Sequence, residues 1–474
     1  MRTRNDQYWR DFKEFREEVY KMIEVSKDEY QRNFFNVEDP KLQWKRIEDN
    51  SKIKAGKTSS NIILQTDEGQ VKEPGRVATI FNEYFKSKVE KLQMRTNPNP
   101  KASAEYTRRF LEGKDVGFLS FRNTDYVEVI EMIRSLKNTN ACGIDGITTK
   151  VLKKFDVLLA PPISHVINLI ITQSKWPQLW KVGIISPVPK KNDLTQASNW
   201  RPVVLNNVMS KIAEKIINKQ LNHHLESRNL LSQTQHTYRS GRSCSSAWHD
   251  IDSFISTGLA EGKILTDQSA AFNVLMAEIL EEKLPLYGLS ADSMRMIMSY
   301  LWGRSTLCQF AGVRSALVRI SFGVPEGSIL GPCLYTLAQM CVPVVKDMVK
   351  EIALEEDQKA VVEEKLDSPT DISTGSAEYA DDVTGLVQAR TEDDFQKLTN
   401  IFMEQYQFYF GLCGLALNNS VVVFRPGKKT KTIAMVGQDE VEDIKLLGLS
   451  LDNTYSFAKH ASKTKSTAEF RLRF

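Results

Sequence analysis

The sequence predicts an α+β protein assembled from several folding units. Its 474 residues correspond to about two to four domains of ordinary size. Apolar residues make up 41% of the chain and charged residues 26%, a composition that excludes disordered, collagenous and fibrous proteins. Helical periodicity dominates near the N-terminus, whereas short apolar segments typical of strands lie farther along the chain. These features together favour helices combined with strands around a sizeable core.

The net charge and the cysteine pattern exclude some classes of protein. The formal net charge is +4, so any strongly basic surface must be local. The 6 cysteines form no C-x-x-C pair, which argues against a disulfide framework or a zinc knuckle and favours a reducing, intracellular compartment. The chain begins without an apolar run, so no secretory signal is expected.

The longest uncharged stretch, Gly327–Val345, raises the question of a membrane span. It contains Gly331, Pro332 and Pro343, and prolines inside a helix remove hydrogen bonds and break it. We therefore expect a buried helix here and no association with a membrane.

The first 135 residues are predicted to form a helical extension and a linker region. Over residues 1–60, apolar residues recur every three or four positions among Arg, Lys and Glu. This pattern favours a solvated amphipathic helix packed on its neighbours over an RNA-binding arm. Residues 61–135 are expected to contain a helix around Val77–Leu92 and a proline-rich linker at Asn97–Lys101.

Basic residues concentrate in the interval Lys181–Ser245, where they far outnumber the acids. Contact with nucleic acid or with a polyphosphate needs such a concentration. Two extended, proline-punctuated segments of this interval carry Lys190 and Arg201, whose side chains suit a grip on a triphosphate. Farther along, Lys346–Asp371 is rich in acids and is expected to be an exposed insertion between two core elements.

Three aspartates stand apart from ordinary surface acids. Asp267 follows the short apolar strand Ile264–Thr266, and Asp381 with Asp382 lies at the tip of a predicted hairpin. Adjacent carboxylates repel each other unless a cation lies between them, and Mg²⁺ prefers carboxylate oxygens and substrate phosphates. Aspartate is also simply a good turn residue, so the pair alone does not decide between a metal site and a turn.

A glycine-rich segment, Gly323–Pro332, lies between these acids in the sequence. Its glycines allow the backbone to approach a ligand closely. Ser328 is suited to cap a following helix, and Pro332 falls where the first turn of that helix tolerates proline.

The order of these segments resembles the ordered motifs of reverse transcriptases from non-LTR (LINE-type) retrotransposons, over about Leu136 to His460. Each motif is weak alone, but together, in one order and at plausible spacing, they point to this family. The motifs are Gly143-Ile144-Asp145-Gly146-Ile147, Pro189-Lys190, Trp200-Arg201-Pro202, Gln235-His236-Thr237-Tyr238-Arg239, Asp267 with Phe272, Gly323 to Pro332, Tyr379-Ala380-Asp381-Asp382, Leu417-Asn418 and Leu447-Gly448.

The resemblance implies a right-hand polymerase fold, in which basic fingers precede a palm built from an antiparallel sheet backed by helices. The implied division is fingers with the start of the palm over 136–266, palm over 267–454, and the start of a thumb over 455–474. Only about one helix of sequence follows Tyr455. We therefore expect the thumb to be largely missing and the chain to be an internal piece of a longer reading frame.

The resemblance also implies roles for single residues. Asp267 and Asp381 would bridge two Mg²⁺ ions, for which Mn²⁺ can substitute, while Asp382 assists. Phe272 would be the gate against ribonucleotides. The implied nucleotide contacts are Lys190, Arg201, Phe272, Glu326 and Gly327, and the implied primer grip is Leu447 with Gly448. The expected partners are an RNA template, a DNA primer and deoxynucleoside triphosphates.

Several positions depart from the family pattern. Glu326 stands where Gln is usual, Val421 where Lys is usual, Asn273 where a second acid is usual and Thr237 where Gly is usual. Two hypotheses follow: an RNA-directed DNA polymerase that adds nucleotides to a primer 3′-hydroxyl, or a catalytically decayed derivative that only binds nucleic acid. A phosphodiesterase using the same carboxylates is disfavoured, because a sugar gate and triphosphate contacts would have no purpose in it.

Overall fold

The computed structural model divides the chain into two compact units, residues 62–456 and residues 1–61 with 457–474. In the second unit, the described positions between 14 and 25 and between 460 and 465 are helical, and the rest of the predicted extension lies outside the described residues. The residues that the structure describes are 63–67, 69–94, 96–190, 193–261, 264–270, 276–320, 323, 327–364, 373–379, 382–389, 391–415, 420–424, 439–440, 443–447, 449–452, 460–462, 464–465 and scattered positions from 14 to 25.

One five-stranded sheet in residues 62–456 has the strand order β12-β11-β5-β10-β9. Its strands are β5 (Ile264–Ala270), β9 (Ser373–Tyr379), β10 (Asp382–Ala389), β11 (Ser420–Phe424) and β12 (Asp439–Glu440). β5 pairs antiparallel with β10 on one side and with β11 on the other, and β9 pairs antiparallel with β10. The hairpin predicted around Asp381 is therefore confirmed. The strand expected to end before Asp267 is present, but it runs through Asp267 to Ala270, so the predicted strand end is wrong.

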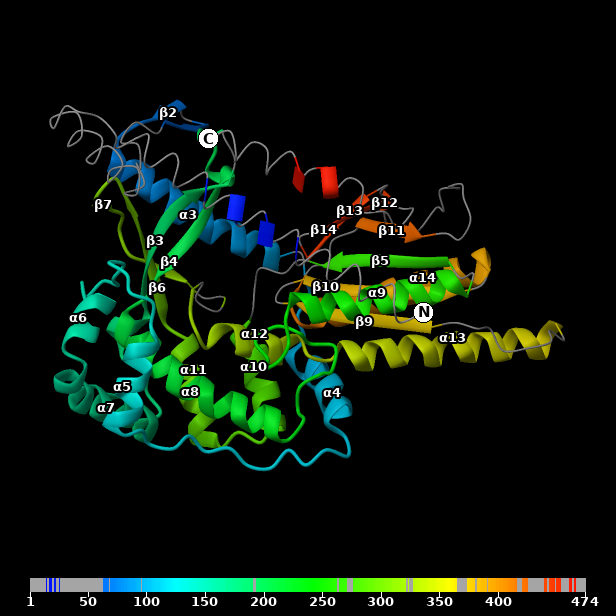
Figure 1. Cartoon of the computed structure of the whole chain (residues 1–474), viewed down its shortest axis with the longest axis horizontal. Helices are drawn as coiled ribbons and strands as arrows, with labels where there is room; N and C mark the ends of the chain where they lie inside the picture. The colour runs from blue at the N-terminus through cyan, green and yellow to red at the C-terminus, as the bar shows by residue number, and fades with distance from the viewer. Residues whose placement is uncertain are drawn as a thin grey trace. The chain divides into compact units, whose positions relative to one another are not determined.

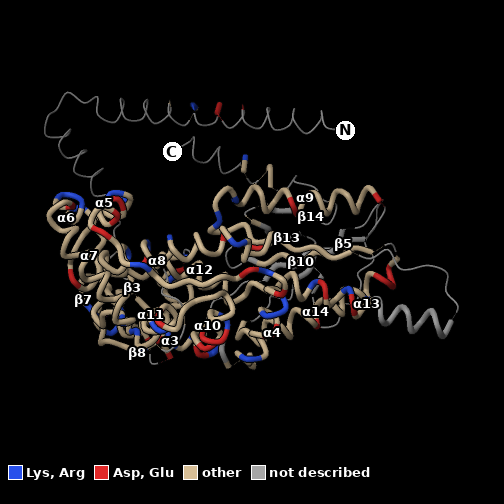
Figure 2. Tube along the Cα trace, turned by 90° about the horizontal axis from the view of Figure 1, so that it is seen from below, with Lys and Arg blue, Asp and Glu red and all other residues tan. Residues whose placement is uncertain are grey.

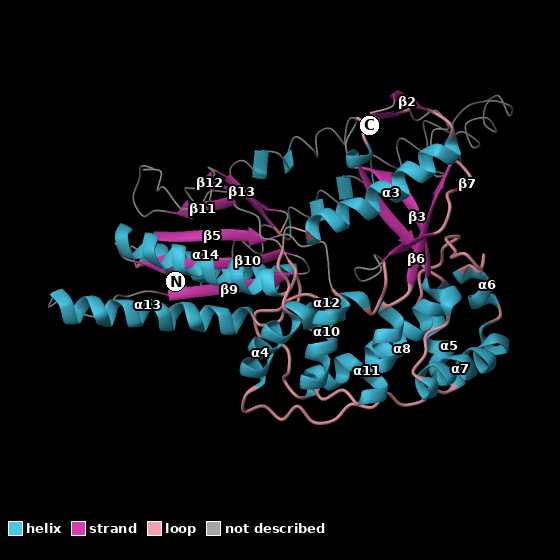
Figure 3. Cartoon of the chain, turned by 180° about the vertical axis from the view of Figure 1, so that it is seen from behind, coloured by secondary structure: helices cyan, strands magenta, loops and turns pink. Residues whose placement is uncertain are grey.

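Helices cover both faces of this sheet. They are α9 (Cys244–Ala260), α13 (Val342–Glu364) and α14 (Glu392–Leu412). Figure 1 shows α9 in front of the strands, and Figure 3, seen from behind, shows α14 on the opposite side. Ile251 of α9 packs with Leu386, whereas Phe402 of α14 packs with Val387. A Cβ atom on Gly385 would lie 2.4 Å from the Phe402 ring, so glycine lets α14 approach β10 closely.

A second sheet has the strand order β4-β3-β6-β7, and β8 also pairs with β6. Its strands are β3 (Val182–Pro189), β4 (Trp200–Leu205), β6 (Arg304–Phe310), β7 (Val313–Arg314) and β8 (Val318–Ile320). The long helix α3 (Pro74–Gln93), which follows the hairpin β1 (Leu64–Thr66) and β2 (Gly69–Val71), packs on it. The ring centroid of Phe81 in α3 lies 5.1 Å from that of Trp200 and 5.8 Å from that of Phe310. The helix around Val77–Leu92 and the extended segments that carry Lys190 and Arg201 are confirmed.

The largest apolar core belongs to a helical region beside the two sheets (Figure 1). Leu280, Ile216 and Ile133 are among its fully buried members. Its helices include α5 (Tyr126–Ser135), α6 (Thr149–Lys154), α7 (Asp156–Gln173), α8 (Val208–Ser227), α10 (Ala277–Lys283), α11 (Ala291–Leu301) and α12 (Gly331–Gln339), and short 3-10 turns lie at Gln178–Lys181, Ala197–Asn199 and Leu284–Tyr287. Helices combined with mainly antiparallel sheets confirm the predicted α+β class.

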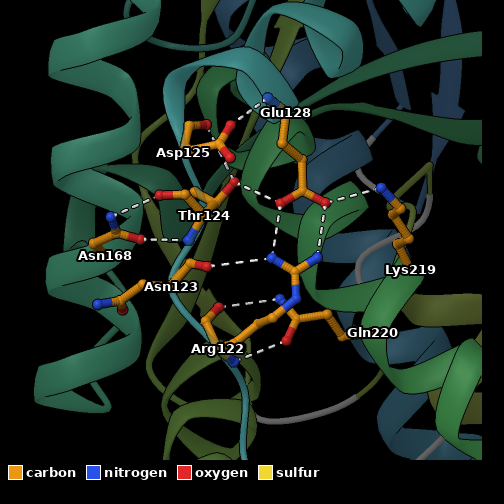
Figure 4. Close-up of polar contacts among 8 residues, drawn as sticks. All are labelled: Arg122, Asn123, Thr124, Asp125, Glu128, Asn168, Lys219 and Gln220. Atoms are coloured by element: carbon orange, nitrogen blue, oxygen red, sulfur yellow. Dashed lines mark hydrogen bonds and ion pairs between the residues drawn. The ribbon is translucent and has the colours of Figure 1, made fainter.

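A polar network holds the chain segment that leads into α5 of this helical region (Figure 4). The buried carboxylate of Glu128 accepts hydrogen bonds from Thr124 Oγ1 at 2.8 Å and from Lys219 Nζ at 2.9 Å, and Arg122 lies 3.4 Å away. Asn168 Nδ2 donates to the Thr124 carbonyl at 2.9 Å. The segment before α5 is thereby held to α7 and α8.

The predicted linker at Asn97–Lys101 is wrong. Asn99 accepts a hydrogen bond from Ala102 N at 3.0 Å and caps α4 (Pro100–Leu111). Proline is tolerated in the first turn of a helix because the amides there have no intrahelical acceptor. The prolines of this segment therefore mark the start of a helix.

The uncharged stretch Gly327–Val345 is largely buried, as predicted, but it contains parts of two helices. α12 ends at Gln339, and α13 begins at Val342. Pro343 lacks an amide donor and would break a continuous helix, but it fits the first turn of a new one. In the part of the chain that the structure describes, no helix is long and apolar enough to cross a bilayer.

The acidic stretch 346–371 does not begin as an exposed insertion. It starts within α13, where Val345, Val349 and Ala353 are buried. Residues four apart lie on one face of a helix, so this part of the stretch is amphipathic and packs on the core. Residues 365–371 lie outside the described residues.

Candidate active site

Asp267 lies on β5, the middle strand of the first sheet. The backbone register places it opposite Leu386 of β10 and opposite Val422 of β11. Val421, the position where the family usually has lysine, pairs with Gln268. The strand that carries the first candidate metal ligand is therefore flanked by the hairpin strand and by β11.

Asp382 is the first residue of β10 and pairs with Tyr379, the last residue of β9. Asp381 comes between them in the sequence but lies outside the described residues. Phe272, Glu326 and Gly448 also lie outside the described residues. Leu386, the partner of Asp267, comes four residues after Asp382 in β10. The two aspartates thus lie on neighbouring strands without being directly opposite each other.

The structure describes only the backbone of Asp267 and Asp382. Among the described side chains, no three His, Cys, Asp or Glu residues form a group that could hold a metal ion. The candidate donors are carboxylates, which Mg²⁺ prefers over nitrogen and sulfur ligands. Their location on adjacent segments of one sheet fits a shared metal site in donor type and topology.

Glu378 lies on β9, the first strand of the candidate hairpin, and no sequence pattern indicated its role. Its side chain is fully buried, and Oε1 accepts a hydrogen bond from Thr234 Oγ1 at 2.6 Å. Its amide donates to the Thr234 carbonyl, and its carbonyl accepts from His236 N, both at 2.8 Å. Burial raises the pKa of Glu378 to about 7, against the opposing effects of Thr234 and the Lys346 charge. The motif that contains His236 therefore packs directly against the edge of the hairpin.

Lys190 and Arg201 come together at one end of the β3–β4 pair. Arg201 pairs with Val188, and Lys190 N donates to the Asn199 carbonyl at 2.7 Å. Both side chains are exposed. Two cationic side chains on neighbouring strands are suited to an anionic ligand such as a triphosphate.

Gly327 brings the glycine-rich segment to the same strand. Its φ is +73°, a left-handed conformation that glycine adopts without strain, and an added Cβ would lie 3.1 Å from the Val204 carbonyl of β4. Val204 follows Arg201 by three residues. Within the described residues, the structure therefore places Gly327 beside the strand that carries Arg201.

Asn207 is a further residue that sequence reasoning missed. It is fully buried, its Oδ1 accepts from Ile144 N at 3.1 Å, and its Nδ2 donates to the Leu179 carbonyl at 2.9 Å. A Cβ on Gly143 would lie 1.8 Å from Asn207 Oδ1. The first glycine of the Gly143 to Ile147 motif therefore lets this segment reach the junction of β4 and α8.

The predicted primer-grip turn joins two short strands, β13 (Asp443–Leu446) and β14 (Leu449–Asp452). Leu447 has a φ of +47° and packs with the apolar cluster of α9 that includes Ile251. Cys244 Sγ lies 3.6 Å from the Leu447 carbonyl. The turn is therefore anchored at the N-terminal end of α9.

Ion pairs neutralise part of the basic interval Lys181–Ser245. Lys219 pairs with Glu128 at 2.9 Å, and Arg239 pairs with Glu226 at 2.9 Å. Arg228 pairs with Asp115 at 2.5 Å. Figure 2 shows Lys and Arg in blue and Asp and Glu in red along the tube. Fewer cations of this interval are therefore available to phosphates than its composition indicates.

Comparison with known proteins adds evidence from outside the chain. The family model described as "Reverse transcriptase (RNA-dependent DNA polymerase)" matches residues 188–448, more than half of the chain. The chain is 26% identical over 351 residues to "Probable RNA-directed DNA polymerase from transposon X-element" of Drosophila melanogaster, an alignment that covers 72% of this chain. It is 22% identical over 413 residues to "RNA-directed DNA polymerase from mobile element jockey" of the same organism, covering 83% of this chain.

A third relative is "Probable RNA-directed DNA polymerase from transposon BS" of Drosophila melanogaster, 23% identical over 357 residues and 71% of this chain. The matched region makes up 36% of the X-element and BS proteins and 43% of the jockey protein. The chain thus corresponds to less than half the length of these relatives.

Proposed function

Because the chain belongs to the reverse transcriptase (RNA-dependent DNA polymerase) family, we propose that it copies an RNA template into DNA by adding deoxynucleotides to the 3′-hydroxyl of a DNA primer. The resemblance to non-LTR retrotransposon enzymes indicated by the ordered motifs is confirmed by the three transposon relatives. The observation that carries the proposal is the pairing of β5 with the β9–β10 hairpin, since both lie within the matched residues 188–448.

In this proposal, the sheet of β5, β9, β10 and β11 is the palm, and the sheet of β3, β4 and β6 belongs to the fingers. The boundaries expected from the sequence assign 136–266 to the fingers with the start of the palm and 267–454 to the palm. β6 (Arg304–Phe310) pairs in parallel with β3, so the fingers sheet takes a strand from the interval assigned to the palm. The second sheet therefore combines strands that come before β5 in the chain with strands that come after it.

Lys190 and Arg201 would bind the triphosphate of the incoming nucleotide, with Gly327 beside them. Arg201 presents a forked, permanently charged donor, which holds a phosphate in one orientation. Phe272 would exclude a 2′-hydroxyl, and Leu447 with Gly448 would support the primer end. The chain's own residues thereby bind and orient both reactants.

Asp267, Asp381 and Asp382 would hold two Mg²⁺ ions. When bound, these ions supply positive charge to the reacting phosphate and lower the pKa of the primer hydroxyl. Asp267 and Asp382 lie on the neighbouring antiparallel strands β5 and β10, so one sheet would supply both carboxylates.

Primer extension on an RNA template tests the proposal. The full chain should extend a DNA primer with deoxynucleotides in Mg²⁺ or Mn²⁺, and Asp381→Asn should abolish extension because an amide lacks the ligand charge. Asp393→Asn is the matched control, since Asp393 is exposed in the first turn of α14. Unchanged extension by Asp381→Asn would refute the proposed site.

A second candidate is a decayed derivative that only binds nucleic acid. Val421 favours it, because β11 places this valine on the strand next to Asp267 where the family usually has lysine. A parent chain that binds an RNA–DNA duplex in a salt-dependent manner, but extends no primer in either metal, would support this candidate.

A further inference from the structure

α8 buries a carboxylate beside the glycine-rich segment. Glu214 is 1% exposed, and its Oε2 accepts hydrogen bonds from Ile329 N at 2.7 Å and from Leu330 N at 3.3 Å. Its Oε1 accepts from Ser210 Oγ at 2.9 Å. Both backbone donors come directly before α12, where amides have no acceptor within the helix. Glu214 therefore holds the end of the glycine-rich segment from a helix more than a hundred residues earlier in the sequence.

The surroundings of Glu214 balance the burial of its charge. Burial raises the pKa of Glu214, whereas the hydrogen bonds from Ile329 and Ser210 and the charge of Arg304 lower it. Arg304 is 2% exposed, and its Nη1 donates to the Tyr300 carbonyl at 3.1 Å. A buried carboxylate persists only where donors and a countercharge compensate it, and these residues provide both.

One continuous chain segment carries both Arg201 and Glu214. β4 carries Arg201, continues through Val204 to Leu205, and leads into α8, which carries Glu214. A Cβ added to Gly327 would lie 3.1 Å from the Val204 carbonyl, and two residues later Ile329 N donates to Glu214. The glycine-rich segment therefore lies beside β4, which presents Arg201, and is held by hydrogen bonds to α8, which follows β4 directly.

We infer that Glu214 is a positioning residue for the incoming nucleotide, which it serves by holding Gly327 and its neighbours at a fixed distance from Arg201. This inference rests on the proposed function, because the ligand is the deoxynucleoside triphosphate of that reaction. Glu214 does not touch the ligand. Its loss frees the glycine-rich segment and weakens nucleotide binding, while the carboxylates of the hairpin stay in place.

Two measurements on the full chain test this role. Glu214→Ala should raise the nucleotide KM in single-nucleotide primer extension on the order of tenfold, the size of one hydrogen bond to a charged group. The turnover rate should change less than KM. Hydrogen exchange should become faster at the Ile329 and Leu330 amides, which lose their acceptor. Glu214→Gln keeps an acceptor oxygen and should stay close to the parent in both measurements.

Glu128→Ala is the matched control, since it removes a buried carboxylate whose hydrogen bonds come from Thr124, before α5, and from Lys219 of α8. It should lower stability without moving the KM or the exchange at residues 329 and 330. Should Glu214→Ala fail to fold, Glu214→Asp draws the carboxylate back by one methylene group and should raise the KM in the same direction. A parental KM in folded Glu214→Ala or in folded Glu214→Asp overturns the inference alone, whereas a parent that extends no primer overturns the proposed function as well.

Discussion

The buried carboxyl of Glu378 should make the stability of the folded chain depend on pH near neutrality. Burial raises its pKa from 4.5 to about 7. The groups that interact with it are Thr234, Lys346 of α13, Tyr406 of α14 and Tyr287. Between these two pKa values the folded chain keeps a proton that the unfolded chain has lost, so the free energy of unfolding falls as pH rises.

The magnitude follows from the pKa shift. About 1.4 kcal/mol per pH unit over this interval gives a loss on the order of 3 kcal/mol, complete above about pH 7. Glu378→Gln carries no ionisable group and still offers an oxygen to Thr234 Oγ1. The variant should therefore resemble the parent near pH 5 and exceed its free energy of unfolding by about 3 kcal/mol near pH 8.

Urea denaturation of both proteins between about pH 5 and about pH 8 measures this difference. The other titrating groups are common to both chains and cancel in the comparison. Glu131→Gln, at an exposed position of α5, is the control and should follow the parent at every pH. A difference that stays constant across the range, or a parent that is the more stable protein near pH 8, would contradict the reasoning.

Two further substitutions have defined outcomes. Arg201→Ala should raise the nucleotide KM ten- to about a hundredfold in single-nucleotide extension with little change in template affinity, whereas Arg319→Ala, exposed on β8, should leave both unchanged. Lys283 is fully buried and donates to the Ala338 carbonyl at 2.5 Å, so Lys283→Met should lower the free energy of unfolding by about 1–3 kcal/mol in urea denaturation, because the last turn of α12 loses its donor. A Lys283→Met chain as stable as the parent would show that the methionine packing offsets the lost hydrogen bond.

Elements with a strong local pattern could be predicted from the sequence. The helix around Val77–Leu92, the strand that begins at Ile264 and the two proline-punctuated strands are all present, although the first of these strands continues past its predicted end at Asp267. Each depends on residues close together in the chain, so periodicity and turn residues suffice to identify it. The segment at Asn97–Lys101 was misjudged because proline and asparagine serve both linkers and helix starts, and only the Asn99 hydrogen bond distinguishes them.

The number of basic side chains that are paired with acids could not be predicted from the interval Lys181–Ser245 alone. Lys219 and Arg228 belong to the basic interval, but their acidic partners Glu128 and Asp115 come before it in the chain. Counting charges within the interval therefore overestimates the cations free to meet phosphate. Lys190 and Arg201, at the end of the β3–β4 pair, are both exposed and are candidates for ligand binding.

The burial of Glu214 and Glu378 could not be predicted from the sequence, for the same physical reason in both cases. Glu214 sits in an ordinary amphipathic helix and Glu378 in a polar strand, and neither neighbourhood distinguishes a buried acid from a surface one. Each binds backbone amides or hydroxyls of a segment far away in the sequence, Ile329 and Leu330 for Glu214 and Thr234 for Glu378.

These two acids differ in what their loss should change, and this difference separates positioning from stability. Glu214 holds a segment that would face the nucleotide, so its removal should act on KM through Gly327 and Arg201. Glu378 is buried on β9 of the hairpin, where its ionisation opposes folding, so its replacement by glutamine should act on stability above neutral pH. If both variants changed KM alike, the glycine-rich segment and the hairpin would move as one unit, and the separate anchors of the two segments could not account for the site.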